Sequence, residues 1–245
     1  MRAKSRCNGV ERATLGAGML LLGSCASPSQ PTFLAFGGMR EVMREGKTEP
    51  RVALAEFARP GWYGVGAMAG LDGEVLIDNG VPWVARGAAK QPGVAERGAM
   101  ATLLTTARVD AWREVSLAVA VDSAGLESAI AAQIAGSNGA DFAPVPFVLE
   151  GRATRLDLHV VRGFCPHSGP PRPEAEPDRW SVPTGHSQSA RLIGFFAPGR
   201  EGVLTHHGTG LHLHALVGPD GTAMGHVDSF QLVAGATLRL PVDRH

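Results

Sequence analysis

The sequence has few cysteines and no net charge, and each of these features argues against particular kinds of structure or binding partner. Its 245 residues include only three cysteines, Cys7, Cys25 and Cys165, of which the first two lie in an N-terminal targeting segment. No internal disulfide is therefore expected, and Cys165 is interpreted as an unpaired structural thiol rather than a nucleophile. Lysine and arginine together number 23, as do aspartate and glutamate. The charge balance thus gives no electrostatic basis for binding nucleic acid or an anionic membrane surface.

Fingerprints of several common enzyme classes are also missing. The sequence has no G-x-S-x-G motif, no phosphate-binding P-loop and no dinucleotide-binding glycine motif, which argues against serine hydrolysis and nucleotide use. Beyond the N-terminus, no run is long and apolar enough to predict a transmembrane helix. With 44% hydrophobic and 19% charged residues, the composition is that of a soluble globular protein with material for one large or two small packed units.

The first 27 residues resemble a secretory signal. "MRAKSRCNGVER" is basic, "ATLGAGMLLL" is a short apolar run, and "GSCAS" supplies small residues at a cleavage site. "LGSC" also resembles a bacterial lipobox, which would make Cys25 the lipidated first residue of the mature chain and its sole membrane anchor. Cleavage after "SCA" would instead leave a free secreted protein. We expect a secreted or cell-envelope location and prefer the lipid-anchored form.

Strands dominate the pattern of residues 28–245, which we expect to form an α/β (α+β) fold. Two β-sheet-containing subdomains with mixed or antiparallel strands and few helices are predicted. The N-terminal half spans about 32–163, an exposed loop with six prolines spans 164–187, and a β-rich half spans 188–245.

Local signals place several elements. Short helices are expected in "GGMREVMREG" (37–46) and "RVALAEFARPG" (51–61), and a longer one in 122–139, capped by Asp122 or Ser123 and ended by Gly136. "EVLI" and "VPWVA" flank "DNG", which predicts a hairpin with a type I′ turn at Asn79-Gly80. Further strands are expected in "ATLLTTARV" and "WREVSLAVAV", and after residue 188 in "ARLIGFFAP", "GVLTHH", "LHLHALV", "AMGHVDSFQLV" and "ATLRLP".

The stretch "GLHLHALVGPDGTAMGHV" (210–227) predicts a group of histidines on one sheet face. On a strand, residues two apart share a face, so His212 and His214 point the same way. "GPDG" favours a type I turn with a bulge at Gly221, which pairs residues whose numbers sum to 440 and places His214 directly opposite His226. Directly paired side chains have Cβ atoms roughly 4.5–5.5 Å apart. The three imidazoles can therefore form a His₃ metal site with open coordination positions.

A simpler interpretation stands beside the metal site. A lone H-x-H is common on solvated strands, and a register slip of one residue would turn His226 to the opposite face. His206 and His207 lie in the preceding loop, and we expect both to be solvated.

Four motifs occur in an order that resembles the acetolactate decarboxylase family. They are "YGVGAMAGLDGEVLIDNGVPW" (63–83), "PFVLEG" (146–151), "IGFFAP" (193–198) and "GLHLHALVGPDGTAMGHVDSF" (210–230), and the resemblance covers roughly residues 30–241. It implies an acetolactate decarboxylase-like α/β fold of two sheet-containing domains, a zinc enzyme that converts 2-acetolactate to acetoin and CO₂, and assembly into dimers.

The resemblance also implies roles for particular residues. His212, His214 and His226 match the zinc ligands, in agreement with the hairpin argument. Glu74 matches the active-site glutamate; from the sequence alone it would be a solvated turn residue. Arg162 resembles the active-site arginine, but its spacing from "PFVLEG" is longer than expected, so Arg155 is an alternative.

The implied chemistry needs these residue types. Decarboxylation of a 2-hydroxy-3-oxo acid leaves an enediolate, whose charge Zn²⁺ can stabilise through the ketone and hydroxyl oxygens as a Lewis acid. Neutral histidines leave the metal charge available. An arginine can pair with the substrate carboxylate, and a carboxylic acid can return a proton to carbon.

Two departures from the family pattern lower the expected activity. Ala67 stands where the family commonly has threonine, and no glutamate follows Glu201 to match the second glutamate near the family's C-terminus. Two other functions therefore stay open: an envelope-located, catalytically impaired binding protein, and a zinc hydrolase, since a His₃ metal can activate water. Acetolactate is made inside the cell, so an envelope location favours the binding protein.

Overall fold

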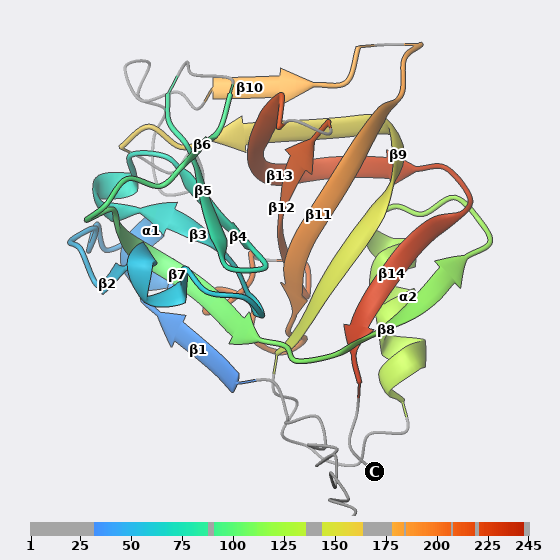
Figure 1. The fold of residues 1–245 in the computed structure, drawn as a ribbon, viewed down its shortest axis with the longest axis horizontal. Helices are drawn as coiled ribbons and strands as arrows, with labels where there is room; N and C mark the ends of the chain where they lie inside the picture. Colours follow the sequence, from blue (N-terminus) through green and yellow to red (C-terminus); the bar gives the residue numbers. More distant parts are fainter. Residues whose placement is uncertain are drawn as a thin grey trace, which may run out of the picture.

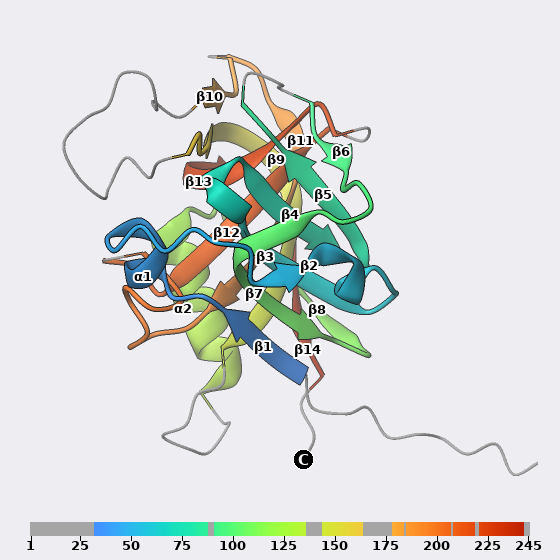
Figure 2. The same ribbon diagram turned by 90° about the vertical axis from the view of Figure 1, so that its left-hand side faces the viewer.

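The computed structural model describes residues 32–87, 91–135, 144–163, 178–183, 185–206, 208–218 and 221–242. Two antiparallel sheets account for most of them, with few helices, as the sequence predicts (Figures 1 and 2). The signal segment with Cys25, and also Cys165 and His207, lie outside the described residues. None of the described helices has the length and apolarity that a bilayer span requires.

The first sheet is built from residues 32–108. Its strands follow the order β1-β7-β3-β4-β5-β6, and β2 also pairs with β7. The strands are β1 (Thr32–Phe36), β2 (Val52–Ala53), β3 (Trp62–Met68), β4 (Glu74–Asp78), β5 (Val81–Ala85), β6 (Gly93–Val94) and β7 (Met100–Arg108).

The second sheet closes partly on itself. The 16-residue strand β9 pairs with β13 along one part of its length and with β11 along another, and β11, β12 and β13 complete a closed ring of four strands. Figure 1 shows β9 crossing the top of this sheet and bending down its side. The strands are β8 (Trp112–Leu117), β9 (Val145–Val160), β10 (Asp178–Ser181), β11 (Gln188–Phe196), β12 (Leu211–Val217), β13 (Ala223–Leu232) and β14 (Ala236–Pro241).

Short-range signals in the sequence are largely confirmed. In the hairpin of β4 and β5, both turn residues have the positive φ that a type I′ turn requires, 47° at Asn79 and 81° at Gly80. In helix α2 (Ser123–Ile134), the carboxylate of Asp122 accepts a hydrogen bond from the Gly125 backbone N–H. Leu126, Ile130 and Ile134, which lie on one face of α2, are buried.

Four local predictions need correction. The segment 51–61 contains β2 and a 3-10 helix, η1 (Leu54–Phe57), instead of an α-helix, and only 39–43 of the first predicted helix forms α1 (Met39–Met43). A further 3-10 turn, η2 (Ala69–Leu71), follows β3. "GVLTHH" is not a strand, because its described residues form a turn closed by a bridge between Glu201 and Thr205. Four residues of the predicted loop 164–187 form β10, which pairs with the end of β9.

The boundary between the sheets also differs from the predicted division at 164–187. It falls between β7 and β8, so β8, α2 and β9 belong with the C-terminal strands. The reason is nonlocal pairing, since β8 and β9 both pair with β14.

Apolar packing and the ion pair between Arg191 and Asp78 help to join the two sheets. An apolar cluster combines Tyr63, Val65 and Leu76 of the first sheet with Val148, Ile193 and Phe195 of the second. The guanidinium of Arg191 on β11 donates to both carboxylate oxygens of Asp78 on β4, at 2.7 and 2.8 Å. Such a bidentate pair has one preferred geometry, so it helps to fix the junction at which the histidines lie.

Candidate metal centre

The β12–β13 hairpin has the predicted register. His214 pairs with His226, and the pairing continues through Val217 and Ala223. The turn closes with a hydrogen bond of 2.7 Å from the Thr222 N–H to the Val217 carbonyl, and Gly221 has the expected positive φ of 65°. The two residues between Gly218 and Gly221 lie outside the described part of the chain.

This register brings the three hairpin histidines together. The ring centroid of His212 lies 5.3 Å from that of His214 and 5.5 Å from that of His226, and His214 and His226 are 5.3 Å apart. All three side chains are buried. The three imidazoles therefore converge on one sheet face, as the sequence predicts.

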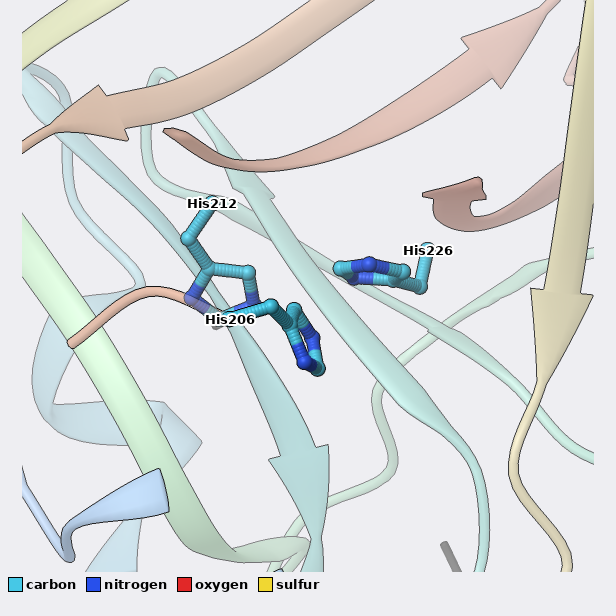
Figure 3. Close-up of side chains that lie close together, drawn as sticks. All are labelled: His206, His212 and His226. Carbon is cyan, nitrogen blue, oxygen red and sulfur yellow. The ribbon is translucent and has the colours of Figure 1, made fainter. Parts of the chain in front are cut away.

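His206 joins the group from outside the hairpin, contrary to the expectation that it is solvated. It is half-buried, and its ring centroid lies 4.5 Å from that of His226 and 5.9 Å from that of His212. One ring nitrogen from each of His206, His212 and His226 can be chosen so that all three lie within 4.8 Å of one another. Figure 3 shows these rings converging on a common space from the loop and both hairpin strands. The loop conformation that causes this is set by distant contacts, which spacing alone does not reveal.

The environment keeps the hairpin imidazoles neutral. Burial lowers the pKa of His214 to about 3, and burial is also the main reason why the pKa values of His212 and His226 lie well below 6.5; neighbouring histidines lower all three further. Among the described residues, Nδ1 of His212 and both ring nitrogens of His214 lack a hydrogen-bond partner. Buried nitrogens without partners are costly, whereas neutral imidazole nitrogens are good ligands for Zn²⁺. These residues therefore fit a metal ion.

Glu74, predicted as an active-site carboxyl, lies beside the histidines and not in solvent. It begins β4, is only 3% exposed, and its Oε1 accepts a hydrogen bond of 3.3 Å from the Val161 N–H. Its Oε2 lies 3.6 Å from Nε2 of His214. Burial raises the pKa of Glu74 to about 7, against the opposing effects of His159 and the Val161 N–H. A carboxyl with this pKa can hold or release a proton near neutral pH.

His159 is a residue of the centre that the sequence argument missed. It lies on β9 opposite His226, is 4% exposed, and its ring centroid is 4.9 Å from that of His226. Its Nδ1 makes a 2.7 Å hydrogen bond with Oδ1 of Asp228. A carboxylate partner on one ring nitrogen fixes the orientation of the other. Its only sequence signal is a histidine within the apolar run "LDLHVV", which does not identify a partner strand.

The two candidate arginines, Arg162 and Arg155, differ in their position relative to the histidine cluster. Arg162 lies beyond the end of β9, its side chain is 47% exposed, and its nearest ion-pair contact is Asp178 at 3.8 Å. It does not line either cavity described below. The alternative, Arg155, does line the outer one, as does Arg179 of β10, which sequence reasoning did not identify. Arg155 pairs with Asp157 and Arg179 with Asp228, both at 3.1 Å.

Two adjoining cavities meet at the histidines. The inner one, about 10 Å³, is lined by Ala67, Glu74 and apolar residues of α1, β3 and β7. The outer one, about 900 Å³, contains Arg155 and Arg179. His159, His206 and His226 line both. The inner cavity has room for an ion or one water molecule, whereas the outer one is large enough for a small organic substrate.

Comparisons with known proteins identify one family by its sequence model and a similar fold among solved structures. The family model described as alpha-acetolactate decarboxylase matches residues 37–242. The solved structure of alpha-acetolactate decarboxylase from Bacillus subtilis strain 168 is similar, with a TM-score of 0.66, 16% identity and 86% of each chain covered. A Staphylococcus aureus protein of unknown function, described as similar to alpha-acetolactate decarboxylase, has a TM-score of 0.59 and 14% identity, with 85% of this chain and 84% of that chain covered. A search of curated protein sequences gave no match.

Proposed function

The chain belongs to the alpha-acetolactate decarboxylase family, and we propose that it is a zinc-dependent carboxy-lyase that converts 2-acetolactate, or a related 2-hydroxy-3-oxo acid, to acetoin and CO₂. One observation carries the proposal: buried, neutral histidines and a carboxyl with a pKa of about 7 meet where the inner and outer cavities join. This arrangement supplies ligands for a metal and a proton donor next to a space for substrate.

The position of each residue indicates its role in the proposed reaction. His212 and His226 belong both to the ligand set that the resemblance implies and to the group of histidines whose ring nitrogens lie within 4.8 Å of one another, so they would hold Zn²⁺. When bound, the metal supplies Lewis-acid stabilisation of the charge that develops on the substrate oxygens as CO₂ leaves. Glu74 holds a proton on the side of Oε2, since Oε1 accepts from the Val161 N–H. It would deliver that proton to carbon after CO₂ has left.

The outer cavity would bind the rest of the substrate. Its wall carries two guanidinium groups, Arg155 and Arg179, which can pair with a carboxylate. His159, oriented by Asp228, presents its other ring nitrogen from β9 and can hydrogen-bond a substrate oxygen. We assign the carboxylate-binding role expected of Arg162 to Arg155 and Arg179, because these two arginines line the outer cavity and Arg162 does not.

A catalytically impaired binding protein is the second candidate. Among the described residues that line the inner cavity, Glu74 is the single carboxylic acid. A site that has one carboxylic acid where the family has two can bind a 2-hydroxy-3-oxo acid and turn it over slowly, because acid–base assistance contributes about 10²–10⁴-fold to rate.

Acetoin release separates the two functions. Zinc-loaded protein, a metal-stripped sample and Glu74→Gln should be compared with 2-acetolactate as substrate. Release from the zinc-loaded sample alone supports the decarboxylase. If all three samples match buffer, the decarboxylase proposal fails, and substrate binding measured by calorimetry then decides whether the binding-protein function takes its place.

We also propose that Cys25 anchors the mature chain to a membrane through lipid. Cys25→Ser should then move the protein from the membrane fraction to the soluble fraction, or leave it unprocessed. If the unaltered protein is already found in the soluble fraction with an unmodified N-terminus, the proposal of a lipid anchor is wrong.

A further inference from the structure

We propose that His206, in the connection between β11 and β12, is a metal ligand in this protein and adds a loop-borne imidazole to the hairpin site. The inference rests on the proposed function in one respect only, namely that the centre binds a metal. It concerns a residue outside the hairpin, and its failure can be told apart from the failure of the metal site itself.

His206 lies close enough to the hairpin histidines to share a metal ion with them. The ring nitrogens of His206, His212 and His226 can be chosen to lie within 4.8 Å of one another. Zn–N bonds are about 2.0–2.1 Å long, so three nitrogens bound to one ion lie about 3.3–3.6 Å from one another. Side-chain movements of about an ångström would therefore bring the three nitrogens into one coordination sphere. His214 is placed differently, because its Nε2 lies against the Glu74 carboxylate at 3.6 Å.

The loop that carries His206 is held in place by hydrogen bonds. The carboxylate of Glu127 on α2 accepts hydrogen bonds from the Thr209 hydroxyl at 2.6 Å and from the Gly210 N–H at 3.0 Å. The hydroxyl of the fully buried Thr205 donates to the Thr209 carbonyl at 2.9 Å. These contacts fix the chain on both sides of His206. A ligand that is held before the ion arrives costs less ordering free energy on binding.

The loop that carries His206 is also hydrogen-bonded to helix α1, on the side of the centre where the first sheet lies. The backbone N–H of Met39, at the start of α1, donates to the Val203 carbonyl at 3.0 Å. Met39 also lines the inner cavity together with His206. Because helices α1 and α2 both hold this loop, the position of His206 is a property of the fold and not of a free surface side chain.

The experiment measures metal affinity and ligand geometry without using activity. His206→Ala is compared with the unaltered protein and with His186→Ala, which removes a histidine that is exposed and lines neither cavity. Zn²⁺ affinity is measured by competition with a chromophoric chelator, and visible absorption is recorded after addition of one equivalent of Co²⁺. Far-UV circular dichroism and urea unfolding of the metal-free proteins report whether each variant folds.

We expect His206→Ala to lower Zn²⁺ affinity at least about 10–100-fold, the range that even residues supporting a ligand produce, and to alter the Co²⁺ absorption bands. His186→Ala should change neither. If His206→Ala does not fold, His206→Gln, which retains a polar side chain of similar size, carries the same expectations. Glu127→Ala should weaken binding by less, because it only releases the loop.

Unchanged affinity and an unchanged Co²⁺ spectrum in a folded His206 variant would overturn the inference and leave the proposed function standing. If the unaltered protein binds neither ion, both the inference and the metal part of the proposed function fail.

Discussion

Replacing Glu74 with glutamine should stabilise the metal-free protein at alkaline pH. The carboxyl is buried, and its pKa is about 7 instead of the ordinary 4.5. Because the pKa of Glu74 is raised on folding, its protonated carboxyl contributes stability that is fully present below pH 4.5 and is lost as the pH rises through 7. The difference corresponds to about 3 kcal/mol in the free energy of unfolding. Glutamine has nearly the same shape and can still accept the Val161 N–H, so it removes the charge and little else.

Urea unfolding of the metal-free proteins at pH 5 and pH 9 measures this effect. The stability advantage of Glu74→Gln should grow by about 2–3 kcal/mol between the two values. Glu56→Gln, at an exposed position, is the matched control and should show no such growth. Added Zn²⁺ at pH 8 should narrow the advantage, because a nearby cation compensates the buried carboxylate. If the free energies of unfolding of Glu74→Gln and the unaltered protein changed in parallel with pH, a buried carboxyl with a raised pKa would be refuted.

Three further predictions concern the surrounding residues. His226→Ala should lose the metal, which full zinc occupancy by atomic absorption would contradict. Arg155→Ala should raise KM for acetolactate while Arg162→Ala leaves it unchanged, because only the former lines the outer cavity; steady-state assays that give the reverse order would restore the sequence assignment. Gly225→Ala should lower the free energy of unfolding in urea by about 1–3 kcal/mol, since the added Cβ would lie 2.5 Å from the His159 carbonyl oxygen. A variant as stable as the unaltered protein would show that β13 can shift away from this contact.

Features set by neighbouring residues could be predicted from the sequence. The H-x-H alternation places His212 and His214 on one face, and the "GPDG" turn fixes the register that puts His226 opposite His214. Asn79 and Gly80 specify their hairpin turn in the same local way. In each case the deciding forces act within a few residues, through strand alternation and allowed φ values.

Features set by distant contacts could not. His206 reaches the centre because Glu127 of α2 holds its loop, and His159 reaches it because β9 pairs with β13. Arg162 lies just past the end of that same strand and misses both cavities. Glu74 acquires a pKa near 7 because it is buried, and its carboxyl contacts Val161 and His214, which are far from it in the sequence. Residue types and spacing therefore determined which hairpin histidines lie together. Sheet pairing and burial decided which other polar groups face them, because both depend on segments far apart in the chain.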